Sequence, residues 1–402
     1  MRIVIIVETF TKNMGYIENI LPKYLAKLGA DVHVVSGLLP AYYYYTDFKE
    51  TYSKFTRSNH RDVLQSEKLD GFTLHTLPVK RVMGYVKLQG LYKKIKDLKP
   101  DIIQINTAIG WIPLEAAFYK TFFQYKLFTG SHRSASTFPL AQRDEIKPWD
   151  IDSLVCLLTR KLPGRLSSLA TEYSYCPTQD CAEIAWKFFG VQKHKVRLMF
   201  LGVDTDYFYP AKRDADSLFE VNRIRQELGF NQGDIVCVYS GKMNDTKNPK
   251  ILAQAISQLR NEGKNFVGLF IGEGIQRHDI EKFNFCRTLD FMPYHEVAKY
   301  YRASDIAVWP TNESISMLDA AACGLPLIVS DGIGYYDHVE GNGLIYQMNN
   351  LPDLIDKLIC LENSNVRRSL GKVGADKMSL NFSWEVVANK RISDYRDVLY
   401  HE

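Results

Sequence analysis

Two carboxylates lie close together in the second half of the chain, in a stretch bounded by short apolar runs. Glu313 falls in a loop after the apolar run 306–309, and Asp319 falls in the first turns of a helix predicted over 317–323; a second apolar run, 327–329, follows. In a parallel α/β sheet, ligands bind at the carboxyl ends of the strands, where backbone N–H groups at helix starts face anions. The two carboxylates would suit a ligand that carries both hydroxyls and phosphates. The alternative is that they only favour the positive end of a helix.

Two lysines occupy a similar position earlier in the second half. Lys242 and Lys247 lie five residues apart in the loop that follows a predicted strand over 235–239. Each is a compact cation suited to phosphate oxygens, so the pair can converge on one pyrophosphate. Solvated loop lysines are the alternative, since lysine is usually exposed.

The first half offers two further candidates. His132 comes just after a predicted strand that begins at residue 126, which places it to enter a cleft, although a histidine there can also only hydrogen-bond its own loop. Gly15 precedes a predicted helix over 17–28, where a glycine lets a backbone approach a ligand or simply makes a turn. The loop lacks the G-x-G-x-x-G pattern, so a dinucleotide site is not indicated.

The elements that must position these residues alternate between strands and helices along the whole chain. A length of 402 residues allows two domains, and 46% hydrophobic with 24% charged residues is typical of a soluble globular protein. No apolar run approaches the length of a membrane span. Seven cysteines without a C-x-x-C pair favour a reducing compartment and argue against a disulfide framework or zinc site.

Several motifs together resemble one family. Asp319-Ala-Ala-Ala-Cys-Gly-Leu-Pro and the Gly-Lys242 with Lys247 five residues on are similar to the signatures of retaining GT-B glycosyltransferases of family four, also called glycosyltransferase group 1. This sequence departs from the family in having Asp319 for Glu and Lys242 for Arg. Counting back eight positions from Asp319 gives Thr311, so either Thr311 or Glu313 takes the place of the first Glu of the family.

The resemblance implies an α/β chain with the GT-B fold, in which two Rossmann-like domains face a central cleft. Residues 1–202 would form the acceptor-binding domain. Within it, the mixed pattern and few turn signals of 135–165 predict helix and loop, which could cover the acceptor groove. Residues 203–381 would bind the nucleotide sugar. Residues 382–402 would form a helix that returns to the first domain.

The resemblance also implies a role for each site residue. His132 and Glu313 would be catalytic, next to the donor sugar, and Lys242 and Lys247 would neutralise the leaving diphosphate. Asp319 would accept hydrogen bonds from the ribose. The other expected donor-binding residues are Gly15, Gly272, Leu289, Ser314, Ile315 and Ser316.

The predicted reaction is therefore transfer of a sugar from a nucleotide donor, a UDP-sugar, with retention at the anomeric carbon. No cofactor is expected and no metal is required, because the Asp-x-Asp letters at 204–206 lie in the linker between the domains. Two alternatives stay open: a nucleotide-sugar epimerase on the same fold, and a non-catalytic nucleotide-binding relative.

Charge is divided unevenly between the halves. Residues 1–200 hold 28 Lys and Arg against 18 Asp and Glu, whereas 201–402 hold 22 against 28. The basic excess is densest over 51–100, where lysines between Lys80 and Lys99 alternate with apolar residues. This pattern predicts a cytoplasmic enzyme at the inner face of a membrane, acting on a glycan or lipid-linked acceptor in cell-surface polysaccharide synthesis. A solvated helix face is the alternative, and no motif indicates nucleic acid.

Overall fold

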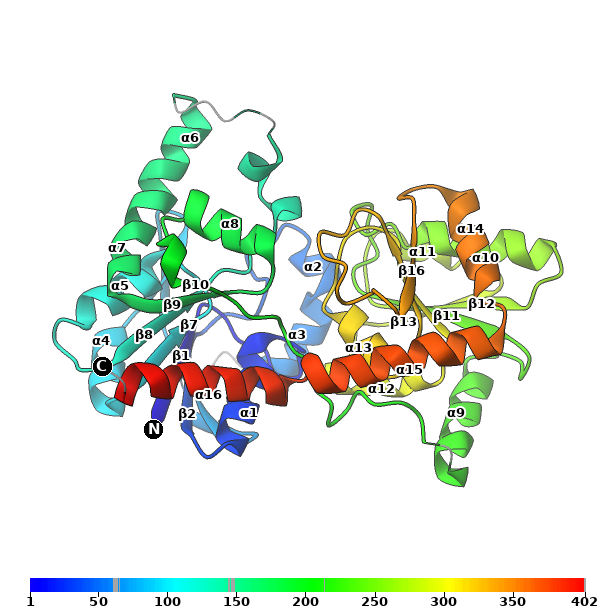
Figure 1. The fold of residues 1–402 in the computed structure, drawn as a ribbon, viewed down its shortest axis with the longest axis horizontal. Coiled ribbons are helices and arrows are strands. Elements are labelled where there is room, and N and C mark those ends of the chain that lie inside the picture. Colours follow the sequence, from blue (N-terminus) through cyan, green and yellow to red (C-terminus); the bar gives the residue numbers. More distant parts are fainter. Residues whose placement is uncertain (61–63, 65, 144, 146–148, 213, 401–402) are drawn as a thin grey trace.

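The computed structural model describes residues 1–60, 64, 66–143, 145, 149–212 and 214–400, which form two α/β lobes side by side (Figure 1). The first sheet has the order β10-β9-β8-β7-β1-β2-β4-β3 and is parallel except for β3, which pairs with β4 antiparallel. The second sheet has the order β13-β12-β11-β14-β15-β16 and is parallel throughout. The predicted α/β class with two Rossmann-like domains is confirmed.

The strands of the first lobe are β1 (Arg2–Val7), β2 (Asp31–Gly37), β3 (Ser66–Leu69), β4 (Phe72–Leu77), β7 (Ile102–Ile105), β8 (Lys126–Gly130), β9 (Thr171–Cys176) and β10 (Val196–Leu198), with a separate hairpin of β5 (Val79–Val82) and β6 (Tyr85–Leu88). Those of the second lobe are β11 (Ile235–Ser240), β12 (Phe266–Ile271), β13 (Cys286–Leu289), β14 (Ile306–Trp309), β15 (Leu327–Ser330) and β16 (Gly343–Tyr346).

The helices of the first lobe are α1 (Ile17–Lys27), α2 (Phe48–Thr51), α3 (Ser53–Asn59), α4 (Leu91–Leu98), α5 (Trp111–Tyr119), α6 (Ile151–Cys156), α7 (Leu162–Ala170) and α8 (Gln179–Lys187). Those of the second are α9 (Ala215–Glu227), α10 (Lys250–Asn261), α11 (Arg277–Ile280), α12 (Tyr294–Arg302), α13 (Ser316–Ala322), α14 (Leu351–Cys360), α15 (Ser364–Asn381) and α16 (Trp384–Tyr400), the last of which lies on the first lobe. Short 3₁₀ turns cover Ala135–Thr137, Pro139–Gln142 and Lys193–Lys195, and a π turn covers Leu157–Lys161.

The central strands are buried on both faces, which explains their continuous apolar runs. Every residue of β11 and β14 is buried, and so is every residue of β1 after Arg2. Because strands that run parallel end at the same edge of a sheet, the loops after β11 and β14 lie together at the carboxyl edge of the second sheet. The edge of the first sheet faces them across the central cleft.

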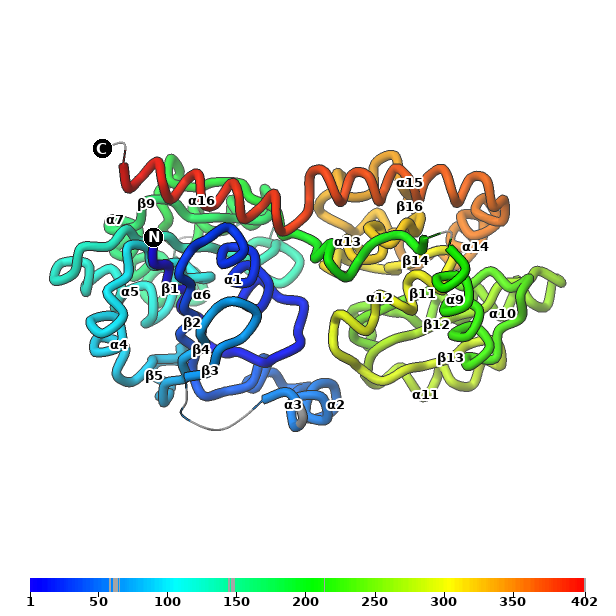
Figure 2. Tube along the Cα trace, turned by 90° about the horizontal axis from the view of Figure 1, so that it is seen from below, coloured from blue at the N-terminus to red at the C-terminus, as the bar shows by residue number. Residues whose placement is uncertain are grey.

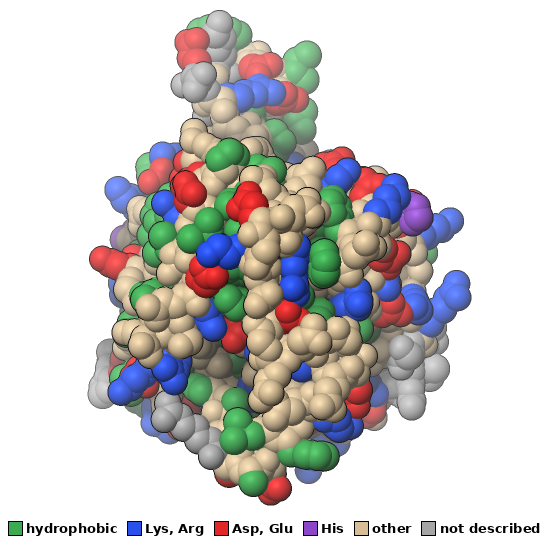
Figure 3. Space-filling view, turned by 90° about the vertical axis from the view of Figure 1, so that its right-hand side faces the viewer, with side chains coloured by type: hydrophobic (Ala, Val, Ile, Leu, Met, Phe, Trp, Pro, Cys, Tyr) green, Lys and Arg blue, Asp and Glu red, His purple; other side chains and the backbone are tan. Residues whose placement is uncertain are grey.

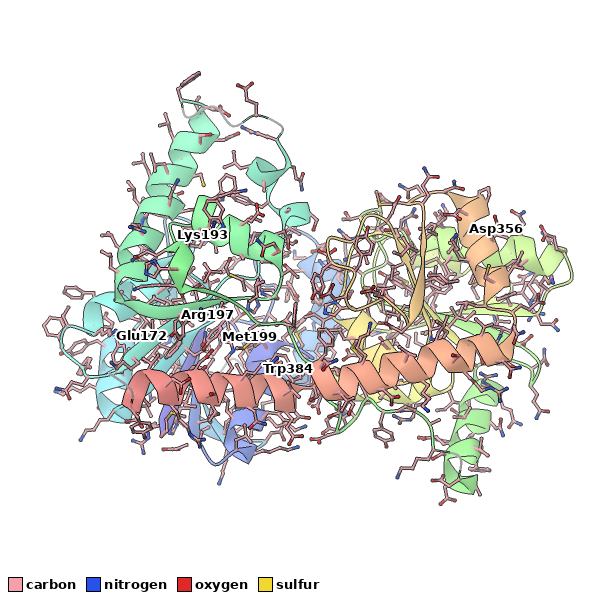
Figure 4. All side chains as sticks on the ribbon, viewed as in Figure 1. Glu172, Lys193, Arg197, Met199, Asp356 and Trp384 are labelled. Carbon is pink, nitrogen blue, oxygen red and sulfur yellow. The ribbon has the colours of Figure 1, made fainter. Side chains whose placement is uncertain are left out.

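The C-terminal helix crosses back to the first lobe, as the resemblance implies. Figures 1 and 2 show α15 on the second lobe and α16 on the first, end to end along one side of the molecule. Trp384 lies where the chain passes between the lobes (Figure 4) and is buried against Gly202, where a Cβ atom would come within 2.8 Å of the indole. Glycine at position 202 is therefore required for this crossing.

A buried carboxylate joins the two lobes near the same crossing. Asp204 is 1% exposed and accepts hydrogen bonds from Lys23 at 2.9 Å and from the Tyr24 hydroxyl at 2.7 Å, both on α1. It also accepts one from the Tyr294 hydroxyl of α12 at 2.9 Å. The Asp-x-Asp letters of 204–206 thus serve the interdomain contact, since Asp206 also pairs with Lys23 at 2.8 Å.

The basic stretch of Lys80 to Lys99 is not one surface helix. Its first part is the β5–β6 hairpin and only its second part is helical, in α4. Lys87 pairs with Glu115 of α5 at 3.1 Å and lies over the Trp111 ring. The expected helix was wrong for residues 80–90 because the antiparallel pairing of β5 with β6 overrides the local pattern.

Replacing Asp204 tests the interdomain contact. D204N removes the charge that balances buried Lys23, so we expect the free energy of unfolding to fall by on the order of 3 kcal/mol. The control variant E227Q, which breaks an exposed ion pair with Arg223 inside α9, should cost less than about 1 kcal/mol. Urea denaturation measures both, and equal losses would contradict the role given to Asp204.

Candidate active site

The loop between β11 and α10 carries both predicted phosphate-binding lysines into one cavity. Lys242 and Lys247 line a cavity of about 340 Å³ between the two lobes. Burial lowers the pKa of Lys247, the Glu313 carboxylate raises it, and repulsion from the Lys242 ammonium lowers it. An anionic ligand between them would relieve that repulsion.

The loop from β14 to α13 forms another wall of this cavity. Ser314, Ile315, Ser316 and Asp319 all line it, as expected. The hydroxyls of Ser314 and Ser316 lie 2.8 Å apart. Burial, and then the nearby carboxylate of Asp204, raise the pKa of Asp319 well above its usual range. A carboxyl group in this wall can form hydrogen bonds with the hydroxyl groups of a ligand.

An arm from the first lobe, residues 41–59, closes over Lys242. The Lys242 ammonium pairs with Asp47 at 2.7 Å and lies within 5.6 Å of the ring centres of Tyr42, Tyr45 and Tyr52. The arm also reaches the second lobe elsewhere, because Lys54 pairs with Asp290. Asp47 therefore holds the cation that a diphosphate would need.

Lys247 is held differently from Lys242. Its ammonium donates a hydrogen bond to the backbone oxygen of Glu313 at 3.0 Å. This contact connects the β11–α10 loop to the β14–α13 loop, so the cation points along the boundary between the cavity and its neighbour. The Glu313 carboxylate offsets part of the charge of Lys247.

A second cavity of about 510 Å³ adjoins the first and shares Tyr16, Tyr42 and Lys247 in its lining. His132 of the first lobe and Glu313 of the second lobe both line it. Burial, with Arg391 as the lesser cause, lowers the pKa of His132 to about 4, so the imidazole is neutral at pH 7.

The structure distinguishes the two candidates for the first acidic position. The Thr311 hydroxyl donates a hydrogen bond to the backbone oxygen of Thr246 at 2.8 Å, and the side chain is buried. Glu313 lines the second cavity, and its carboxylate accepts a hydrogen bond from the Gly334 N–H at 3.3 Å. Glu313 is thus the one that a ligand can reach.

Of the two glycines and one leucine expected to bind the donor, only one lines the first cavity. Gly15 lines the first cavity, where a Cβ atom would meet Tyr294 of the other lobe at 3.2 Å. Gly272 and Leu289 do not reach the cavity wall. A Cβ atom at Gly272 would meet the backbone oxygen of Gly241 at 2.0 Å, so this glycine serves close packing between two loops.

Sequence reasoning missed the arm and one acid of the second cavity. Asp47 and the tyrosines of 42–45 gave a signal only as an unusual aromatic run, and nothing local showed that they cross to the other lobe. Glu18, in the first turn of α1, lines the second cavity, and burial raises its pKa to about 7. A third cavity of about 320 Å³ lies beyond it, lined by Glu8, Glu18 and Arg133 among others.

Among the described residues, no group of three or more His, Cys, Asp or Glu side chains is arranged to hold a metal ion. None of the described helices has the length and apolarity needed to cross a bilayer. The site is therefore a two-lobed cleft with two cations at one side and a neutral histidine with two carboxylates at the other.

Comparisons with known proteins agree with this class of site. Residues 234–364 match the family model described as "Glycosyl transferases group 1". The D-inositol 3-phosphate glycosyltransferase of Rhodococcus erythropolis is 26% identical over 238 residues, which are 54% of this chain and 52% of that protein. The chain thus spans about half the length of the curated relatives that it matches.

Solved structures share the fold over the full chain. Sucrose-phosphate synthase of Thermosynechococcus elongatus superposes with a TM-score of 0.71 at 16% identity, covering all of both chains. WaaG, a glycosyltransferase involved in lipopolysaccharide biosynthesis, superposes with a TM-score of 0.65 at 12% identity, again covering all of both chains. Residues 234–364 therefore match the glycosyl transferases group 1 model within a chain that has the GT-B fold, and the resemblance to that group is confirmed.

The raised pKa of Glu18 predicts a pH dependence of stability. Between about pH 4.5 and pH 7 the folded state binds the proton and the unfolded state releases it, so stability falls as the pH rises through this window. The difference in unfolding free energy between the wild type and E18Q should therefore decrease as the pH rises through that range and stay constant at higher pH. Urea denaturation at a series of pH values measures this. E183Q, at an exposed acid of α8, is the control, and a flat difference for E18Q would contradict the burial of Glu18.

The Asp47 contact predicts competition with an anionic ligand. In D47N, Lys242 is released, so the apparent affinity for a nucleoside diphosphate should rise about fivefold, roughly 1 kcal/mol for one ion pair. K54Q removes the other ion pair between the arm and the second lobe without touching Lys242. Isothermal titration with both variants measures the effect. Equal changes in affinity for D47N and K54Q would show that release of the arm, and not the charge of Asp47, controls binding of the nucleoside diphosphate.

Proposed function

We propose that this chain is a retaining glycosyltransferase that moves a sugar from a nucleotide donor to an acceptor held by the first lobe. The observation that carries the proposal is the convergence of Lys242 and Lys247 in a cavity that also holds Asp319. Diphosphate is the leaving group of such a transfer, and fixed cations stabilise the charge that develops on it.

The two lobes divide the donor and acceptor between them. The first cavity, with the lysine pair and Asp319, suits the nucleotide, and the second, with His132 and Glu313, suits the sugar and acceptor. A neutral His132 can hydrogen-bond a sugar hydroxyl without attracting a second phosphate. Retention of the anomeric configuration rests on the family resemblance, and analysis of the product anomer by NMR tests it.

We further propose UDP as the nucleotide and a glycan or lipid-linked acceptor in cell-surface polysaccharide synthesis. TarM of S. aureus, which shares the fold with a TM-score of 0.61 at 11% identity, has been solved in complex with UDP. A panel of UDP-, GDP- and ADP-sugars tested by thermal shift identifies the donor, because a ligand that binds only the folded chain raises its melting temperature. No metal addition should be needed for the shift.

Removal of Lys247 tests the proposal most simply. K247A should lower the rate of transfer about a hundredfold or more, because one charge facing the diphosphate is lost in the transition state. K264A is the matched control, since Lys264 is a paired lysine of the second lobe remote from the cleft. Unchanged turnover in K247A with a working donor would remove the phosphate role.

The same assays separate the two alternatives. A nucleotide-sugar epimerase would convert the donor to its epimer without any acceptor. A non-catalytic relative would show the thermal shift with a nucleotide but neither transfer nor hydrolysis. A glycosyltransferase needs both substrates for product to form.

A further inference from the structure

A helical rod on the first lobe turns its apolar side chains to the solvent. α6, the π turn Leu157–Lys161 and α7 follow one another without a break over residues 151–170. Figure 1 shows this rod along the outer edge of the lobe, with the α6 end standing clear of it. Large apolar side chains recur on it at spacings of three or four residues, each between 49% and 75% exposed; we call Ile151, Val155, Leu158, Leu162, Leu166 and Leu169 the apolar stripe.

The opposite side of the rod is the one that packs, and it is made of small residues. Ser167 and Ser168 are buried, and a Cβ atom at Gly164 would come within 1.9 Å of the Phe189 backbone oxygen. An ordinary helix of a soluble protein buries its apolar face and exposes the polar one. Here the arrangement is reversed, and the close packing of Gly164 prevents the rod from rolling over to bury its leucines.

The apolar surface continues onto the neighbouring helix. α5 packs along α7, and at its end Phe118 and Phe122 are each 60% exposed. Tyr92 of α4 lies edge-on to Phe122 with ring centres 6.4 Å apart. At the other end of the rod Trp149 is 76% exposed. Figure 3 shows hydrophobic side chains on the projecting end of the rod, above the body of the molecule.

Basic residues border this apolar surface. Lys161 and Arg165 of the rod are exposed, and so are Lys93 and Lys96 of α4. Asp152, the acidic residue of α6, is already paired with Arg143. An exposed apolar stripe with cationic borders is the pattern of a helix that lies in the interface of a membrane with anionic lipids.

We propose that the apolar stripe and its basic border dock this protein on an anionic lipid surface. A second copy of the chain fits less well, since a symmetric pairing through the stripe would bring Lys161 and Arg165 against the same residues of the other copy. The surface is separate from most of the Lys80–Lys99 stretch and shares with it only α4.

The rod is connected to the wall of the second cavity. Ser134, Ser136 and Thr137 line this cavity, and the next residue, Phe138, packs in one apolar cluster with Cys156 of the rod. The segment 134–142 thus joins the rod to the side of the cleft that we propose binds the acceptor. Delivery of a membrane-held acceptor to this cavity rests on the proposed function, whereas the docking itself does not.

Flotation of the full chain with vesicles tests the proposal. Wild-type protein should float with phosphatidylcholine vesicles that contain phosphatidylglycerol, and less so in high salt or with phosphatidylcholine alone. L158E/L166E should weaken binding at least about tenfold. L218E/L380E, at exposed leucines of the second lobe, is the matched control and should bind as the wild type does.

Three outcomes would overturn the proposal. One is wild-type protein that stays unbound at low salt, and another is L158E/L166E that floats as well as the control variant. The third is light scattering that shows a dimer for the wild type and a monomer for L158E/L166E, because the stripe would then be a subunit interface. K247A should float normally, so failure of the glycosyltransferase proposal and failure of lipid docking are distinguished.

Discussion

The arrangement of the whole cleft depends on the buried carboxylate of Asp204. Lys23 and Tyr24 reach it from the first lobe and Tyr294 from the second, so three hydrogen bonds fix how the two sheet edges face each other. A buried charge of this kind is costly unless it is fully paired, which makes the relative position of the lobes specific. The same carboxylate raises the pKa of Asp319, so the interdomain contact also adjusts the site.

The cations of the site are restrained from both lobes in this structure. Asp47 of the arm pairs with Lys242, and the Glu313 backbone oxygen accepts from Lys247. In the proposed function, phosphate oxygens of the donor would replace these contacts. The arm would respond to that exchange, since it belongs to the first lobe and pairs with the second lobe at Lys242 and at Asp290.

The sequence predicted the strongly patterned elements well. β1, β14 and α13 were found because continuous apolar runs and small helical residues leave few alternatives. Residues 151–165 of the rod were expected only as part of a helix and loop over 135–165, because apolar periodicity does not show whether a stripe faces the core or the solvent. The reversed arrangement follows from Gly164, whose contact with Phe189 only the tertiary structure reveals.

Site residues could be predicted where they follow the end of a strand. They could not be predicted where they depend on contacts between the lobes. Lys242, Lys247 and Asp319 meet in one cavity as expected, whereas Gly272 and Leu289 stop short of it. Asp47 could not be foreseen, because its partner lies 195 residues away on the other lobe.

A crystal structure of the protein with bound UDP would show whether the lysine pair holds the diphosphate. We expect the diphosphate within hydrogen-bonding distance of the Lys242 and Lys247 ammonium groups, the ribose beside Asp319, and Asp47 displaced from Lys242. Nucleotide bound elsewhere, with the pair of Asp47 and Lys242 intact, would contradict it.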